Sequence, residues 1–210
     1  MAHTPSGCKV VIAGQNLRLQ DSAHLFSTEP LLRNLMPAHI RLAVPADAPL
    51  LPRIERSAAQ AFRSIDGLGW LADAATLTVE RHRQLIALST CWVAVDAQGQ
   101  PQGFLSAERH GSDLHIEELS VCQSMQGQGW GRKLVETAMD HARSNHLRCV
   151  TLTTFTHVPW NAPFYQRLGF LDNAGATLDE RLADILAQEY AHGFEPGMRC
   201  AMSWRVAQTR

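Results

Sequence analysis

Short segments in which apolar and polar residues alternate, or in which β-branched residues are concentrated, predict strands at several places along the chain. We expect strands at residues 39–44, 91–95, 103–108, 114–121, 148–153 and 198–206. Gly111, Ser112 and Asp113 are turn-forming residues, so the strands on either side of them are expected to form an antiparallel hairpin.

Apolar residues at helical spacing predict helices in the remaining segments. A first helix is expected to start at Pro45–Asp47 with Asp47 as its N-cap, and others are expected at 76–88, 132–144, 161–168 and 178–191. Strands and helices alternate only in part, and several successive strands can pair antiparallel. The fold class is therefore α/β (α+β), with a central mixed, largely antiparallel sheet flanked by helices.

Residues 1–35 do not continue this pattern. Their apolar piece, residues 10–13, is too short and too poorly flanked for a signal peptide. We expect this segment to be a poorly ordered N-terminal extension, or translation to start properly at Met36. Residues 36–210 are expected to form a single domain, which is large enough to bury its own core.

The composition argues against several classes of function. A net charge of -1 and a pI near 6.8 provide no basic face, so nucleic acid is not an expected partner. No apolar run approaches the roughly 18 residues of a membrane span. Five widely spaced cysteines without a C-x-x-C pair or a secretory signal indicate reduced thiols in a cytoplasmic protein. The ten histidines contain no H-x-x-x-H or H-E-x-x-H pattern, so no metal site is expected.

The stretch Gln126–Gly131, Q-G-Q-G-W-G, follows a predicted strand and opens a predicted helix. Its alternating glycines leave backbone N–H groups uncovered, and a helix start adds unpaired donors and partial positive charge. Such a loop suits a phosphate or diphosphate, and a flexible turn is the alternative interpretation of a lone glycine loop. The spacing fits neither the G-x-G-x-x-G fingerprint nor the P-loop, because Lys133 is followed by Leu134.

The pattern resembles the acetyl-CoA diphosphate loop of the GNAT N-acetyltransferase superfamily, in which Gln126, Gly129 and Gly131 occupy the family's [Q/R]-x-x-G-x-[G/A] positions. A second block, 161–170, resembles the family's last conserved region, N-x-x-x-Y-x-x-x-G-F. The resemblance extends from about Ile40 to Val206. Gln123 departs from it, since many members have proline there.

The resemblance implies acetyl-CoA as cosubstrate. The residues expected to bind it are the strand residues Leu119, Ser120 and Val121, the loop residues Gln126, Gly127, Gln128, Gly129, Trp130, Gly131 and Arg132, and Asn161. In the family, the last strand residues splay away from their neighbour, so the Val121 N–H would face the thioester carbonyl. Asn161 is expected both to cap its helix and to contact the pantetheine arm.

Acetyl transfer to an amine needs a proton acceptor and a proton donor. An alkyl amine with a pKa of about 10.4 is neutral only to about one part in 10³ at pH 7, so a general base is required. The family often places an acid on the strand before the loop, which favours Glu117 as base with Glu118 in reserve. Strand alternation would send the two to opposite faces, with Glu117 beside Leu119 and Val121. Tyr165 is the expected acid for the departing thiolate.

Several points stay open from the sequence. The expected acceptor is a primary amine of a small molecule or peptide, and a protein lysine, a protein N-terminus or a longer acyl-CoA are alternatives. A non-catalytic acyl-CoA sensor is the alternative from another class. Phe62 and Trp70 lie in the segment that borders the acceptor site in the family, or they simply pack in the core. The sequence does not decide between a monomer and a homodimer.

Overall fold

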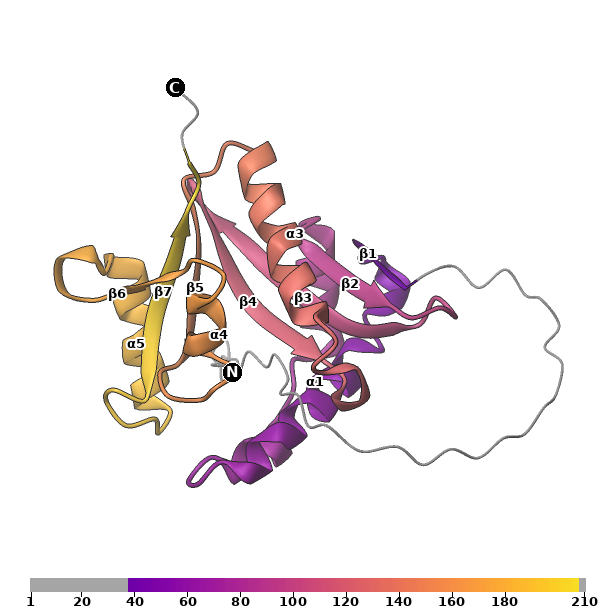
Figure 1. Ribbon diagram of the computed structural model, residues 1–210, viewed down its shortest axis with the longest axis horizontal. Helices are drawn as coiled ribbons and strands as arrows, with labels where there is room; N and C mark the ends of the chain where they lie inside the picture. Colours follow the sequence, from indigo (N-terminus) through magenta and orange to yellow (C-terminus); the bar gives the residue numbers. More distant parts are fainter. Residues whose placement is uncertain (1–37, 208–210) are drawn as a thin grey trace, which may run out of the picture.

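A computed structural model describes residues 38–207, which form a seven-stranded sheet in the order β1-β2-β3-β4-β5-β7-β6 (Figure 1). The strands are β1 (His39–Leu42), β2 (Cys91–Val95), β3 (Pro101–His110), β4 (Asp113–Val121), β5 (Cys149–Phe155), β6 (Leu171–Asn173) and β7 (Arg199–Arg205). Only β4 and β5 run parallel, and the other neighbours are antiparallel. The predicted mixed, largely antiparallel sheet is therefore confirmed.

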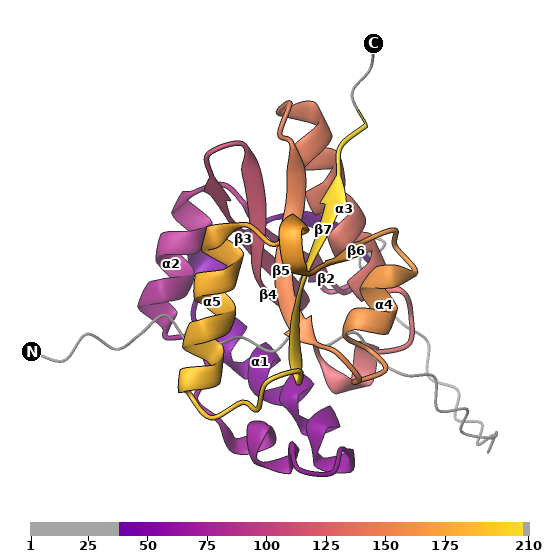
Figure 2. The same ribbon diagram turned by 90° about the vertical axis from the view of Figure 1, so that its left-hand side faces the viewer.

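Helices cover both faces of this sheet (Figures 1 and 2). The α-helices are α1 (Leu51–Ala59), α2 (Val79–Ala87), α3 (Trp130–Ser144), α4 (Ala162–Gln166) and α5 (Glu180–Ala191). Short 3-10 turns are η1 (Pro45–Asp47), η2 (Gln60–Ser64), η3 (Gly69–Asp73), η4 (Gln123–Met125) and η5 (Gly175–Thr177). The apolar residues of α3 and α4 pack on one face, whereas those of α1, α2 and α5 pack on the other.

Two local predictions need correction. Asp47 does not cap α1, because it lies in η1, where its carboxylate accepts a hydrogen bond from the Val44 N–H (2.8 Å) and binds Arg41 (2.7 and 2.9 Å). Strand β6 was missed, since its three residues are too few to show a pattern. The predicted N-terminal extension, residues 1–35, lies outside the described residues.

Strands β4 and β5 separate soon after they meet. Their parallel pairing covers only three residue pairs, from Asp113 opposite Cys149 to His115 opposite Thr151. Beyond these pairs β4 continues to Val121 and β5 to Phe155, and the two strands diverge (Figure 1). The splay expected near Val121 is confirmed, and it leaves the edge of β4 beyond His115 without a strand partner among residues 38–207.

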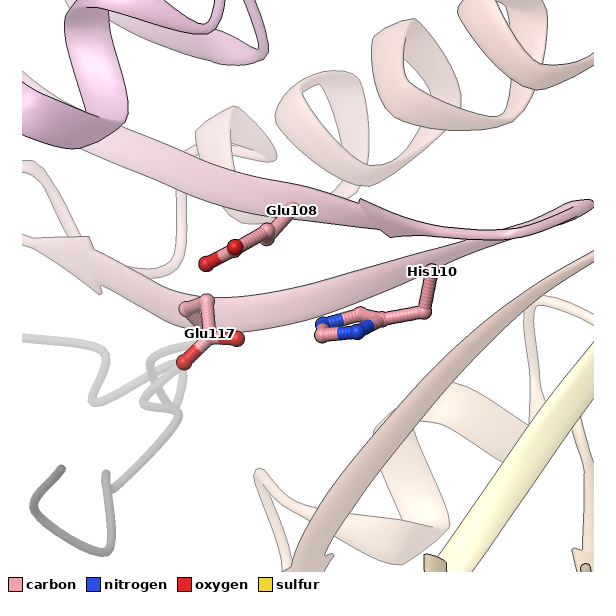
Figure 3. Close-up of side chains that lie close together, drawn as sticks. All are labelled: Glu108, His110 and Glu117. Carbon is pink, nitrogen blue, oxygen red and sulfur yellow. The ribbon is translucent and has the colours of Figure 1, made fainter. Parts of the chain in front are cut away.

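A β-bulge resets the alternation of side chains along β4. Ser106 of β3 pairs with Glu118, but the next residue, Ala107, pairs with Ile116, so Glu117 is the extra residue. Leu119, Val121 and Ile116 all pack in the core under α3. Glu117 lies instead near Glu108 and His110 on the opposite face (Figure 3).

The prediction that Glu117 shares a face with Leu119 and Val121 is therefore wrong. Simple alternation would place neighbouring residues on opposite faces, but the inserted residue shifts Glu117 to the side on which Glu118 already lies. Both carboxylates consequently face away from α3.

The described cysteines, Cys91, Cys122, Cys149 and Cys200, are free thiols. Between residues 38 and 207, none of the helices combines the length and the apolar character that crossing a bilayer requires.

Candidate active site

The glycine loop joins the end of β4 to the start of α3. Gly127 and Gly129 have φ values of 75° and 85°, the left-handed region that favours glycine. Gly129 is the N-cap of α3, and no side chain at this position accepts a hydrogen bond from the first turn. The first turn also carries no acidic residue. A Cβ on Gly129 would meet no atom within 4 Å. The first-turn N–H donors of α3 therefore face open space that an anion can enter.

A pocket of about 330 Å³ lies in front of this loop. It is lined by Val121, Met125, Gln126, Gly127, Gly129, Trp130, Gly131, Arg132, Phe164 and Arg167. Sequence reasoning missed Met125, Phe164 and Arg167. Phe164 and Arg167 lie on either side of Tyr165 in the block 161–170. The sequence identified this block as part of the site, but it did not show that these two side chains line the pocket.

The two loop glutamines differ in what they contact. The Gln126 side chain donates a hydrogen bond of 3.0 Å to the Val121 carbonyl oxygen and so fastens the loop to the end of β4. The Gln128 side chain is exposed and donates to the Ser124 carbonyl oxygen at 3.1 Å. Gln126 lines the pocket, and Gln128 lies outside it.

The open edge of β4 presents main-chain groups to the gap. The Cys122 N–H donates to the Gln102 carbonyl oxygen of β3 at 2.7 Å. Because alternate residues of a strand turn their N–H groups to opposite edges, the N–H groups of Val121 and Leu119 point away from β3 and into the splay. The Ser120 hydroxyl donates instead to Glu118 at 2.7 Å.

Asn161 fastens α4 to β5. Its side-chain amide is buried and donates a hydrogen bond of 2.8 Å to the Thr154 hydroxyl. The predicted side-chain cap is wrong, because the amide is turned toward β5 and makes no cap hydrogen bond to α4. The main-chain oxygen of Asn161 accepts the N–H groups of Phe164 and Tyr165, which starts the helix without a side-chain cap.

Tyr165 is fully buried in α4, beside the gap. Its ring packs against Phe164 and Phe170, with centroids 5.1 and 5.4 Å away. Its hydroxyl makes no hydrogen bond to the described residues. Burial raises the pKa of Tyr165 well above its ordinary value, the charge of Glu118 raises this pKa further, and Arg199 opposes both effects. The phenol is therefore protonated at neutral pH.

The two candidate bases have different surroundings. Glu118 is buried, accepts the Ser120 hydroxyl and lies opposite Ser106. Glu117 is half-buried in the bulge, and one of its carboxylate oxygens lies within 4.8 Å of ligand atoms of Glu108 and His110. The charge of Glu118 contributes to the raised pKa of Tyr165, which puts these two groups within electrostatic reach of each other.

Of the two aromatic residues that the sequence placed near the acceptor site, Phe62 is a core residue and Trp70 is a surface residue. Phe62 is fully buried against Phe155 and Trp160, with ring centroids 5.5 and 5.8 Å away. Trp70 is 53% exposed and lies 5.8 Å from the ring of Phe194. Core packing is therefore the role of Phe62, while Trp70 connects η3 to the loop before β7.

Residues 56–170 match the model of the acetyltransferase (GNAT) family. This segment contains the splayed strand, the glycine loop and α4. The chain belongs to the acetyltransferase (GNAT) family, and it is an acyltransferase whose cosubstrate is acetyl-CoA.

Solved structures with the same fold come from several organisms. The PaiA N-acetyltransferase from Thermoplasma acidophilum, solved with coenzyme A, is 13% identical, with 81% of this chain and 100% of that chain covered and a TM-score of 0.58. The ribosomal-protein-S18-alanine N-acetyltransferase from Escherichia coli is 16% identical, with 82% and 96% covered and a TM-score of 0.55.

A third structure is the N-acetylglutamate synthase from Neisseria gonorrhoeae in complex with coenzyme A and N-acetyl-glutamate. It is 16% identical, with 81% of this chain and 35% of that chain covered and a TM-score of 0.59. At these identities the similarity establishes the fold alone.

Proposed function

We propose that the protein transfers the acetyl group of acetyl-CoA to a primary amine of a small molecule or peptide by direct attack. The observation that carries the proposal is the buried Tyr165 hydroxyl, which makes no hydrogen bond to the described residues. It lies on a helix tied to β5 through Asn161 and within electrostatic reach of Glu118 on β4. A thiol leaving group between the splayed strands would meet this hydroxyl.

In this proposal the glycine loop holds the diphosphate of acetyl-CoA. The uncapped N-terminus of α3 supplies N–H donors, and hydrogen bonds to a charged group contribute roughly 1.5–3 kcal/mol each. Arg132 and Arg167 line the same pocket and add positive charge. The pantetheine arm then runs along the open edge of β4, where the N–H groups of Leu119 and Val121 point into the gap. The Val121 N–H stabilises the oxyanion of the tetrahedral intermediate.

Tyr165 is proposed as the general acid. The amine nitrogen attacks the thioester carbon, the C–S bond breaks, and the phenol proton passes to the departing sulfur. With ordinary pKa values of about 10 and 8.5, this transfer is uphill by about 2 kcal/mol, so it has to accompany C–S cleavage. The raised pKa of Tyr165 keeps the proton on the phenol until negative charge develops on the sulfur.

We favour Glu118 over Glu117 as the general base. Glu118 is buried on the side of β4 away from α3, and its charge acts on Tyr165. An amine between the two groups would give its proton to Glu118 while Tyr165 protonates the sulfur on the other side of the scissile bond. Glu117 has its carboxylate beside Glu108 and His110 and stays the alternative base.

A thiol-release assay tests the proposal. The full chain is incubated with acetyl-CoA and a panel of alkyl amines, polyamines, amino acids and lysine-containing peptides, and free coenzyme A is measured. We expect release that depends on the amine and is lost in Tyr165→Phe. Calorimetric binding of acetyl-CoA without release for any amine supports the sensor. Release with peptides alone supports a protein acetyltransferase.

A further inference from the structure

Three side chains converge on the sheet face that carries α1, α2 and α5 (Figure 3). Glu108 and His110 are two residues apart on β3 and therefore share a face, and the bulge brings Glu117 of β4 to the same face. One ligand atom from each of the three side chains lies within 4.8 Å of the other two. Two carboxylate oxygens and an imidazole nitrogen thus surround one point.

A buried hydroxyl lies on the same sheet face as this group, opposite the proposed base. Ser106 is fully buried, and its hydroxyl makes no hydrogen bond to the described residues. In the β-ladder it is directly opposite Glu118, and it is two residues from Glu108 on the same face of β3. The hydroxyl is an unsatisfied polar group, and burying such a group is costly unless something binds it.

Glu108, His110 and Glu117 can each accept a hydrogen bond from a cationic group. Arg81 of α2 binds one carboxylate oxygen of Glu108 at 2.9 Å. Burial and the positive charge of Arg181 lower the pKa of His110, so its imidazole is neutral at pH 7 and carries a lone pair. Glu117 and Glu118 add two further carboxyl groups to this face.

The spacing of the acceptor atoms is compatible with an ammonium group. One nitrogen that bonds three acceptors tetrahedrally at about 2.8 Å holds them about 4.6 Å apart. A zinc-like ion with ligands at about 2.1 Å holds them about 3.4 Å apart. The three atoms lie within 4.8 Å of one another, which admits both arrangements, and the amine acceptor of the proposed function favours the ammonium.

The distance to Glu118 sets the length of a bound amine. Glu108 is two residues beyond Ser106, the partner of Glu118, so the backbone of Glu108 lies about 7 Å further along β3 at about 3.4 Å per residue. Two nitrogens joined by four carbons are about 6 Å apart when the chain is extended.

We propose that the acceptor is a linear diamine or polyamine, whose second ammonium binds among Glu108, His110 and Glu117 while its first amine reacts beside Glu118. This inference rests on the proposed function and adds the chemical class of the acceptor. The Ser106 hydroxyl accepts a hydrogen bond from the reacting amine or from its neighbour along the chain.

The test compares butylamine with α,ω-diamines of three to six carbons on the full chain. We expect kcat/KM for 1,4-diaminobutane to exceed that for butylamine by at least tenfold, with a maximum near four carbons. Glu108→Gln should reduce this ratio at least fivefold. Asp140→Asn removes a carboxylate on α3, on the other face, and should preserve the ratio.

Equal kcat/KM values for butylamine and the diamines would overturn the acceptor assignment while leaving the acetyltransferase proposal standing. Release of coenzyme A with no amine at all would contradict both. Calorimetry with Zn²⁺ and Mn²⁺ gives the remaining outcome: tight metal binding that Glu108→Gln abolishes, together with an unchanged diamine ratio, would reassign the three side chains to a metal.

Discussion

The side-chain amide of Asn161 donates a hydrogen bond of 2.8 Å to the Thr154 hydroxyl, and this contact ties the start of α4 to the diverging end of β5. Tyr165 is one turn further along α4. The bond therefore fixes where the Tyr165 hydroxyl lies relative to the gap between β4 and β5. A residue that sequence reasoning treats as a helix cap instead connects two walls of the site.

Asn161→Ala and Thr154→Val should be coupled. Both groups are buried, so each single change leaves the other without its partner and should cost about 1–3 kcal/mol of unfolding free energy. The double variant should cost less than the sum of the singles. Urea denaturation of all four proteins measures the coupling, and additive losses would show that the bond contributes nothing.

Tyr165→Phe should lower kcat at least tenfold and change acetyl-CoA affinity little. Phenylalanine keeps the ring contacts to Phe164 and Phe170, and the lost hydroxyl makes no hydrogen bond to the described residues, so stability should not fall. Steady-state kinetics and calorimetry measure both effects.

The other tyrosine provides a matched control. The Tyr190 hydroxyl donates to the Arg199 carbonyl oxygen at 3.2 Å, so Tyr190→Phe should cost about 1 kcal/mol of stability. Its kcat should stay within about twofold of the wild type. A similar loss of kcat in both variants would point to a structural effect rather than to proton donation.

Gly129→Ala should weaken acetyl-CoA binding. Its φ of 85° strains any other residue by about 1–2 kcal/mol, and the added methyl group enters the space in front of the α3 N-terminus. Gly99→Ala is the matched control, because Gly99 has a φ of 77°, equally open surroundings and a position in the β2–β3 turn. Calorimetry should show weaker binding only for Gly129→Ala, and equal affinity would remove the loop from the cofactor site.

High pH should destabilise the protein partly through Tyr165. Its pKa is raised in the folded state, so its contribution is fully present below the unfolded value of about 10 and is lost as the pH rises through the folded value. Buried thiols act in the same direction: burial raises the pKa of Cys91 and Cys149 to about 12 and that of Cys200 to about 11. Unfolding free energies between pH 8 and 11 should therefore fall more steeply for the wild type than for Tyr165→Phe, and identical slopes would contradict the assigned shift.

Glu118→Gln should lower kcat more than Glu117→Gln. Glutamine has nearly the same shape and cannot accept the amine proton, and Glu118 is within electrostatic reach of Tyr165. We expect at least a tenfold loss for Glu118→Gln at pH 7. The reverse order would return the role of base to Glu117.

Much of the fold follows from the sequence, because hydrophobic periodicity and turn residues are local signals. The register of β4 cannot be predicted from local sequence signals, because a bulge depends on how two strands pair. This one inserted residue is why alternation assigned Glu117 to the wrong face. The glycine loop was predictable because φ values near 80° at Gly127 and Gly129 require glycine.

Contacts between distant segments account for the other differences. The direction of the Asn161 amide is set by Thr154 on another element, and the position of Arg167 in the pocket by the docking of α4. Glu108 and His110 stand at strand spacing in the sequence, which the H-x-x-x-H and H-E-x-x-H patterns do not describe. Grouping them with Glu117 required the bulge.

The central claim is that the glycine loop aims the sulfur of coenzyme A at the Tyr165 hydroxyl. A crystal structure of the chain with coenzyme A tests it directly. We predict diphosphate oxygens at hydrogen-bond distance from the first-turn N–H groups of α3, and the sulfur in the splay at hydrogen-bond distance from the Tyr165 hydroxyl. A diphosphate bound elsewhere, or a sulfur separated from that hydroxyl by other side chains, would contradict it.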